Sequence, residues 1–181
     1  MAKADPIKEE RYTPSEYVAL VKKVLRRIYL DPFSCKEANR IVKASTYYTR
    51  EQDGLKQDWD WADTIFLNPP YRDMSKPVEK LISWLDINRP TQQAIMLCNA
   101  ATDTRWFHRI CSVRYYAHVS LCIVRGRIQF YQPKAIEKRE SKSKSKKTRN
   151  QPEKPSLFVY FGKQQKLFGE VFSSVGEVVG L

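Results

Sequence analysis

The tetrapeptide Asn68-Pro69-Pro70-Tyr71 carries the clearest chemical signal in the sequence. Its prolines stiffen the backbone, and Pro69 biases Asn68 away from helical angles. Because proline has no N–H, the segment presents carbonyl acceptors beside the Asn68 amide oxygen, which suits an exocyclic amino group. Tyr71 adds a ring that can stack on a planar base. A plain turn is the alternative, since Asn and Pro are common turn formers. A turn, however, requires neither the aromatic residue nor the buried strand before it.

Two polar positions follow apolar segments that are typical of strands. Asn68 follows Thr64–Leu67, and Asp31 follows the short apolar step at 28–30. In open α/β sheets, ligands bind beyond the carboxyl ends of the strands. We therefore expect Asp31 and Asn68 to lie on the functional edge of a sheet.

The elements that position these residues alternate between helix and strand patterns. Apolar residues recur at helical spacing from Tyr17 to Ile28, after a predicted capping box with Thr13 as N-cap. A second capping box is predicted to begin at Ser34. Further strands are predicted at 94–98, 126–131 and 156–161, with helices between the earlier ones. This alternation predicts an α/β fold with parallel central strands.

Composition limits the classes of protein that the chain can belong to. It has 181 residues, 42% of them hydrophobic, which predicts one domain over 12–181 after a flexible N-terminus at 1–11. Apolar runs are too short to span a membrane, and no secretory signal is evident. Four cysteines without Cys-x-x-Cys spacing and two histidines argue against a zinc site or a histidine-based triad, and favour free thiols in a reducing compartment.

Charge favours a polyanionic partner. Lys and Arg number 32 against 20 Asp and Glu, a net charge of +12. Half of that excess lies in one segment at 134–155, whose centre contains no hydrophobic residue and which we expect to be a flexible loop. It is predicted to contact DNA phosphates through Lys142, Lys144, Lys146, Lys147 and Arg149. A solvated insertion is the alternative.

The chain resembles the phage-type DNA N-6-adenine methyltransferase (Dam) family. The ordered segments that carry the resemblance are Thr13-Pro14, Leu30-Asp31-Pro32, Asn39, Tyr47-Tyr-Thr-Arg-Glu-Gln-Asp-Gly-Leu55, Trp59, Leu67-Asn-Pro-Pro-Tyr71, Thr104-Arg-Trp106, Gly126-Arg-Ile-Gln-Phe130 and Ser156-Leu-Phe-Val-Tyr-Phe-Gly162. The resemblance implies a Rossmann-like three-layer sandwich that uses S-adenosyl-L-methionine (AdoMet) without a metal. It also implies methyl transfer to N6 of an adenine flipped out of double-stranded DNA.

The resemblance assigns site residues by position. Asn68, Pro69, Pro70 and Tyr71 would be catalytic. The residues implied to contact AdoMet are Tyr12, Thr13, Pro14, Asp31, Pro32, Phe33, Glu51, Asp53 and Asn68, with Glu51 competing with Asp53 for the adenosine end. Arg127 is a candidate DNA contact. The implied setting is the cytoplasm of a prokaryotic cell or a phage-infected host, with a monomer favoured.

The chain departs from the wider methyltransferase pattern in two ways. Asp31-Pro-Phe-Ser34 stands where many of these enzymes have a glycine-rich loop, and Asp31 and Asn68 are only 37 residues apart. The full set of strands and helices hardly fits between them, so we expect an abbreviated mixed sheet on the cofactor side. The alternative functions are methylation of RNA adenine or of a protein glutamine, and non-catalytic nucleic-acid binding by a decayed methyltransferase fold.

Overall fold

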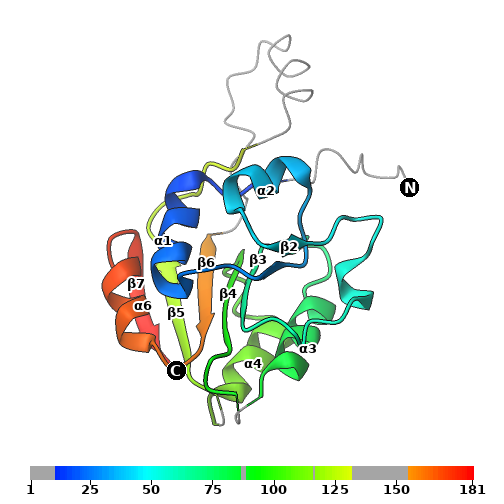
Figure 1. The fold of residues 1–181 in the computed structure, drawn as a ribbon. Coiled ribbons are helices and arrows are strands. Elements are labelled where there is room, and N and C mark those ends of the chain that lie inside the picture. Colours follow the sequence, from blue (N-terminus) through cyan, green and yellow to red (C-terminus); the bar gives the residue numbers. More distant parts are fainter. Residues whose placement is uncertain (1–10, 87–88, 116, 132–154) are drawn as a thin grey trace, which may run out of the picture.

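Helices and strands alternate along the chain (Figure 1). The computed structural model describes residues 11–86, 89–115, 117–131 and 155–181. Its helices are α1 (Ser15–Leu25), α2 (Lys36–Val42), α3 (Ser75–Trp84), α4 (Arg105–Ser112) and α6 (Gln165–Phe172), with short 3-10 helices at Gly54–Lys56 and Val113–Tyr115. Its strands are β1 (Leu30–Asp31), β2 (Thr46–Tyr47), β3 (Thr64–Leu67), β4 (Gln93–Asn99), β5 (Val119–Val124), β6 (Ser156–Phe161) and β7 (Gly176–Gly180).

These strands form one mixed sheet in the order β2-β1-β3-β4-β6-β5-β7. The half from β2 to β4 is parallel, with Ile65 of β3 paired to Leu30 of β1 on one side and to Ala94 of β4 on the other. The half from β6 to β7 is antiparallel. Strands β1 and β2 have only two residues each. The prediction of an α/β fold with a mixed sheet is therefore confirmed, and the two short strands lie in its parallel half.

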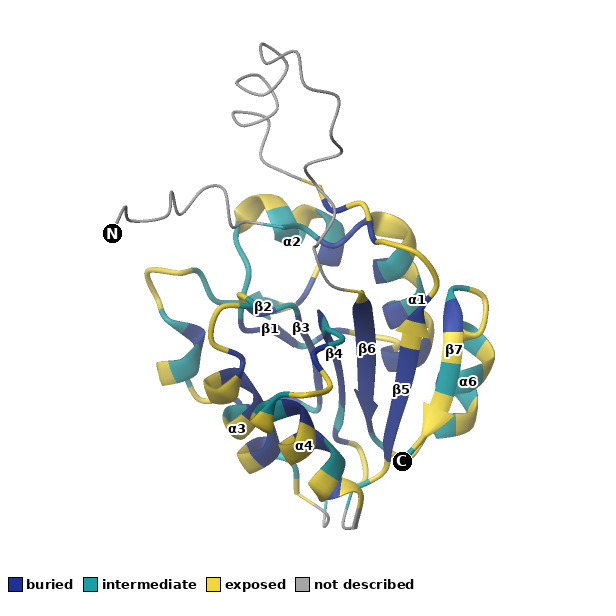
Figure 2. Ribbon diagram, turned by 180° about the vertical axis from the view of Figure 1, so that it is seen from behind, coloured by how far each residue is buried: buried dark blue, intermediate teal, exposed yellow. Residues whose placement is uncertain are grey.

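Helices cover both faces of the sheet, which gives the predicted three layers. On one face, Val21 of α1 and Phe168 of α6 pack with Phe158 of β6. On the other, Leu81 of α3 and Ile110 of α4 pack with the remaining side chains of the central strands. Figure 2, seen from behind, shows α3 and α4 in front of the buried strands. Because both faces are covered, β6 is buried along its whole length and reads as a continuous apolar run.

The helix starts differ from the predicted capping boxes. Helix α1 begins at Ser15 with Pro14 as N-cap and no side-chain capping bond, because the Thr13 hydroxyl accepts a hydrogen bond from Asn68 instead. Helix α2 begins at Lys36, where the Sγ of Cys35 rather than Ser34 accepts from the Ala38 N–H. The chain thus uses Thr13 at the edge of the sheet and not at the helix end.

The strand predicted at 126–131 is absent in the structure. Ile128 and Phe130 are buried at alternate positions, which produces the period-two pattern of a strand. They are buried against the α1 side of the core, however, while only Tyr131 makes an isolated bridge, to Tyr12. The strand of this region is β5, just before it.

Two predicted segments fall largely on residues outside the described ranges. They are the N-terminus at 1–11, of which Arg11 alone is described, and the basic segment at 134–155, of which Pro155 alone is described. Both remain predictions.

Candidate active site

Polar residues of four strands meet at one edge of the sheet. Asp31 ends β1, Asn68 follows β3, and Asn99 ends β4, all at the carboxyl edge of the parallel half. Because β6 runs antiparallel to β4 and pairs Ser156 with Asn99, its first residue lies at that same edge. The edge predicted to bind ligand thus carries Asp31 and Asn68, as expected, together with Asn99 and Ser156.

The Asn68 side chain is held by its nitrogen. Nδ2 donates to the carbonyl oxygen of Arg11 at 3.0 Å and to Oγ1 of Thr13 at 3.3 Å. Within the described part of the chain, no donor reaches Asn68 Oδ1. Both acceptors are therefore used to orient the amide, and its oxygen is left able to accept a hydrogen bond from a ligand.

The segment at 11–14 crosses the edge from β3 toward β1. Thr13 contacts Asn68, and the hydroxyl of Tyr12 accepts a hydrogen bond from Cys35 Sγ at 3.4 Å, just beyond β1. The Tyr12 backbone also exchanges two hydrogen bonds with Tyr131, at 2.9 and 3.0 Å. The segment that contains Tyr12, Thr13 and Pro14 is thus brought to Asn68, more than fifty residues away in the sequence, through Arg11 and Thr13.

Asp31 is a buried carboxyl group at the end of β1, with 3% of its surface exposed. Burial raises its pKa from 3.8 to about 7, while the hydrogen bond from the Phe33 N–H and the nearby Ser34 hydroxyl partly oppose the shift. The Phe33 N–H lies 3.3 Å from Oδ1. When the pKa of a carboxyl group lies near neutral pH, a cation or hydrogen-bond donor beside it stabilises the charged form. Such carboxyl groups are typical of ligand-binding positions.

The 48–57 segment is fastened onto the end of β1. A Cβ at Gly54 would overlap the carbonyl oxygen of Pro32, so only glycine permits this approach. The Trp59 indole donates to the Gly54 carbonyl at 2.9 Å, and the Ser34 N–H donates to the Tyr48 carbonyl at 3.0 Å. This close approach brings the segment that carries the predicted acidic residues next to Asp31-Pro32.

The two acidic candidates on that segment differ in setting. Asp53 adopts a positive φ of 53°, caps the short helix by accepting from the Leu55 N–H at 3.3 Å, and pairs with Lys56 at 3.4 Å. Glu51 is exposed, and a hydrogen bond that it accepts from the Thr49 side chain lowers its pKa. Asp53, which directly precedes Gly54, is the one fixed beside β1.

Tyr71 lies with its ring against the core cluster of the α3–α4 face. Burial raises the pKa of its phenol above the ordinary range. Pro69 is buried and Pro70 is exposed, so the two prolines carry the chain from the sheet to the surface. Arg127 is exposed on the stretch that leads to Tyr131, whereas Lys142, Lys144, Lys146, Lys147 and Arg149 lie outside the described residues.

Four buried side-chain oxygens near this edge make no hydrogen bond with the described part of the chain. They are Ser34 Oγ, the Tyr71 hydroxyl oxygen, Asn99 Oδ1 and Ser156 Oγ. Buried polar groups in folded proteins are nearly always paired, so a group of exceptions at a ligand edge indicates positions that a ligand or water satisfies. Sequence reasoning missed Asn99 and Ser156, although each adjoins a buried apolar strand, as Asn68 does.

The described residues contain neither a metal-binding cluster nor a membrane-spanning helix. No group of His, Cys, Asp and Glu among them could hold a metal ion. No helix among them is long and apolar enough to cross a membrane.

Three layers of α/β structure, with an asparagine-diproline segment and a buried acid at the carboxyl edge of the parallel strands, are consistent with the Rossmann-like fold of methyltransferases. A family model described as DNA N-6-adenine-methyltransferase (Dam) matches residues 3–176. The chain belongs to this family, and membership implies an enzyme that methylates adenine N6 in DNA. No curated protein matches the chain.

Proposed function

We propose that the protein transfers the methyl group of AdoMet to N6 of an adenine flipped out of double-stranded DNA. The single observation that carries the proposal is the orientation of Asn68. Its amide nitrogen is fixed by Arg11 and Thr13, and its oxygen remains able to accept. An acceptor at this position recognises an amino group, which must give up one proton when it is methylated.

The chemistry required of the protein is modest. The adenine amino lone pair is delocalised into the ring, so N6 is a weak nucleophile. Hydrogen bonds from N6 to Asn68 Oδ1 and to the Pro69 carbonyl would favour a tetrahedral nitrogen and stabilise its developing positive charge. Such preorganised dipoles are the cationic counterpart of an oxyanion hole.

AdoMet, when bound, supplies an activated methyl group on a sulfonium. The residues at the β1 end suit a cationic ligand that also carries a nucleoside. Asp31 is a buried carboxyl without a salt bridge among the described residues. The close contact between Gly54 and Pro32 keeps Asp53 near the end of β1. We assign Asp31, Pro32 and Phe33 to the cofactor, with Asp53 rather than Glu51 at its adenosine end. Tyr12, Thr13 and Pro14 would close over it.

The acceptor base would lie on the other side of Asn68. Asn99 and Ser156 follow along the sheet, beyond β3, and their unpaired atoms offer hydrogen bonds to a base. Inside a duplex the amino group is stacked and cannot face the cofactor, so the base must rotate out of the helix. Tyr71 would stack on the extruded base.

Labelled methyl transfer tests this proposal. The protein, with AdoMet labelled in the methyl group, is offered duplex DNA, structured RNA and a glutamine-containing protein in parallel, while calorimetry measures AdoMet binding. We expect binding of AdoMet and label in the duplex DNA alone. Label in RNA or protein would support the corresponding alternative. Absence of AdoMet binding would leave a non-catalytic nucleic-acid-binding protein and overturn the proposal.

A further inference from the structure

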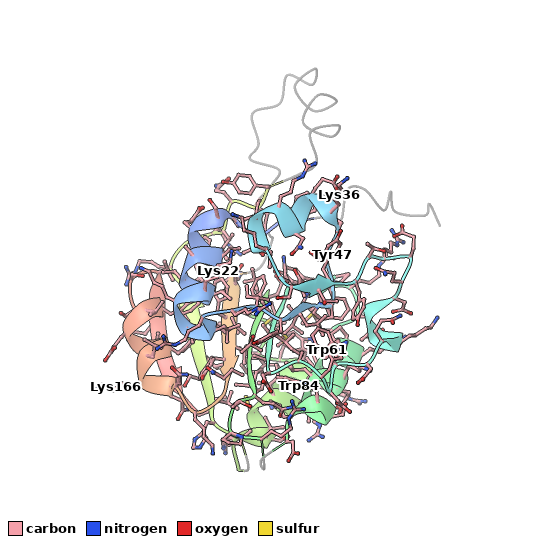
Figure 3. The ribbon with its side chains drawn as sticks, in the orientation of Figure 1. Lys22, Lys36, Tyr47, Trp61, Trp84 and Lys166 are labelled. Atoms are coloured by element: carbon pink, nitrogen blue, oxygen red, sulfur yellow. The ribbon has the colours of Figure 1, made fainter. Side chains whose placement is uncertain are left out.

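The exposed surface of α1 and α2 is rich in positive charge. Residues 15–45 place seven basic side chains there against two exposed acidic ones, Glu16 and Glu37. The basic residues are Lys22, Lys23, Arg26, Arg27, Lys36, Arg40 and Lys43. Figure 3 labels Lys22 on α1 and Lys36 on α2. We call these seven residues the α1–α2 basic surface.

The charges of this surface are uncompensated, unlike those of the opposite face. Among the described residues, none of the seven forms an ion pair. On the α3–α4 face, Lys76 pairs with Asp73 at 3.5 Å and Arg109 pairs with Glu79 at 3.3 Å. The two helical layers of the sheet therefore differ in how their exposed charges are paired.

Several of these cations are held close together. The Lys22 ammonium donates to the Ile41 carbonyl at 3.4 Å, which joins α1 to α2. Burial and then the nearby charge of Lys43 lower the pKa of Lys22. Arg27 donates to Ser45 Oγ at 3.1 Å, and its guanidinium lies 4.6 Å from the centre of the Tyr29 ring. Two of the seven cations, Lys22 and Arg27, are therefore held in place by neighbouring groups.

Two of the cations occupy strained backbone. Arg26 ends α1 with φ 62° and ψ −56°, and Lys43 ends α2 with φ 54° and ψ 43°. Lys43 has the left-handed conformation in which helices commonly end with glycine, and Arg26 has a different conformation with positive φ that also favours glycine. A cation near a helix C-terminus gains a little from the helix dipole, but Lys22, Lys23 and Arg40 already stand in those last turns.

We propose that the α1–α2 basic surface binds the phosphate backbone of the duplex that flanks the flipped adenine. This inference rests on the DNA substrate of the proposed function. Helix α1 starts beside Asn68 through Thr13, and α2 starts just beyond Asp31. At about 1.5 Å per residue, Arg26 lies roughly 20 Å along α1 from Thr13. That length of duplex carries on the order of a dozen phosphates.

The test replaces Arg26 and Lys43, the two cations with positive φ. The double variant Arg26→Gly, Lys43→Gly removes two charges and relieves the backbone. We expect the Tm to be unchanged or higher, AdoMet affinity to be unchanged, and the slope of log affinity for duplex DNA against log salt to fall by roughly 2. The matched control, Lys163→Gln with Lys166→Gln, removes two exposed cations elsewhere and should lower the slope by much less. A second pair, Lys23→Gln with Arg40→Gln, changes exposed helical positions and should reproduce the loss.

Equal slopes for the control and both test pairs would overturn the proposal, as would a change confined to structured RNA. Failure of the proposed function gives a different result. In that case neither the unchanged protein nor any variant transfers methyl groups to DNA. The salt titration still shows which cations contact phosphate.

Discussion

At the scale of single residues, two asparagines differ in how their side-chain amides are used. Asn39 uses both ends of its amide on Ala44, donating at 3.2 Å and accepting at 2.8 Å, and so closes the end of α2. Asn68 uses only its nitrogen. The sequence motif predicted the importance of Asn68, but only the fold shows that Arg11 and Thr13 orient its oxygen.

Replacing Asn68 tests that distinction. Asn68→Ala should lower kcat by about 10²-fold or more, because one preorganised acceptor is lost, with AdoMet affinity almost unchanged. Asn39→Ala serves as the control. It should lower the Tm and leave kcat of the folded protein nearly intact. Steady-state kinetics and calorimetry provide the readouts, and an equal loss of cofactor affinity in Asn68→Ala would contradict the assigned role.

For Asn99 and Ser156 we expect substitution to keep or raise stability, whereas Asn39→Ala should lower it. Their buried unpaired atoms carry a desolvation cost that no hydrogen bond offsets. Asn99→Ala and Ser156→Ala should therefore keep or raise the Tm of the free protein, while weakening productive DNA binding and raising KM for DNA. Thermal unfolding and kinetics check both. A lower Tm combined with unchanged kinetics would assign these residues to folding alone.

At the scale of elements, strands buried on both faces were the easiest to predict. The runs at 64–67, 94–98 and 156–161 match β3, β4 and β6 because each is continuously apolar. The strand predicted at 126–131 was wrong, because Ile128 and Phe130 are buried on the α1 side of the core without pairing to a strand. Burial of alternate residues there gives the same sequence pattern as a strand. The spacing of apolar residues does not show which backbone segment lies beside them. Strand β7 was not predicted, because three of its five residues are exposed and its sequence has no apolar pattern.

The contact between the 48–57 segment and β1 can be tested through glycine. Gly54→Ala places a Cβ against the Pro32 carbonyl, so the segment must shift; we expect a loss of about 1–3 kcal/mol in stability and weaker AdoMet binding. Gly169→Ala is the matched control, because nothing lies within 4 Å of its added Cβ in α6. It should stabilise by up to about 1 kcal/mol. Denaturant unfolding separates the two, and equal behaviour would contradict the close approach.

At the scale of the whole molecule, charge distribution and burial set the response to salt and pH. The net charge of +12 was evident in the sequence, and the part predicted to bind DNA at 134–155 lies outside the described residues. The α1–α2 basic surface could not be recognised from sequence, because its cations come from two helices and only the fold shows them close together and unpaired.

The buried Asp31 predicts a pH dependence of stability. Its pKa is about 7 in the folded protein and about 3.8 as the ordinary value, so between these pH values the folded state holds a proton that the unfolded chain has released. Stability should therefore fall as pH rises through that window, by on the order of a few kcal/mol, and level off above it. Asp31→Asn should remove this fall and be the more stable protein above pH 7. Urea unfolding at several pH values checks the prediction, and identical pH profiles would contradict it.

The central claim is the identity of the methylated atom, and one measurement tests it directly. Duplex DNA incubated with the protein and AdoMet is digested to nucleosides, and the modified nucleoside is identified by mass spectrometry against N6-methyladenosine, N4-methylcytidine and C5-methylcytidine standards of the deoxy series. The account predicts N6-methyldeoxyadenosine with the unchanged protein and at least a 10²-fold lower yield with Asn68→Ala under initial-rate conditions. A methylated cytosine, or equal adenine methylation by the two proteins, would contradict it.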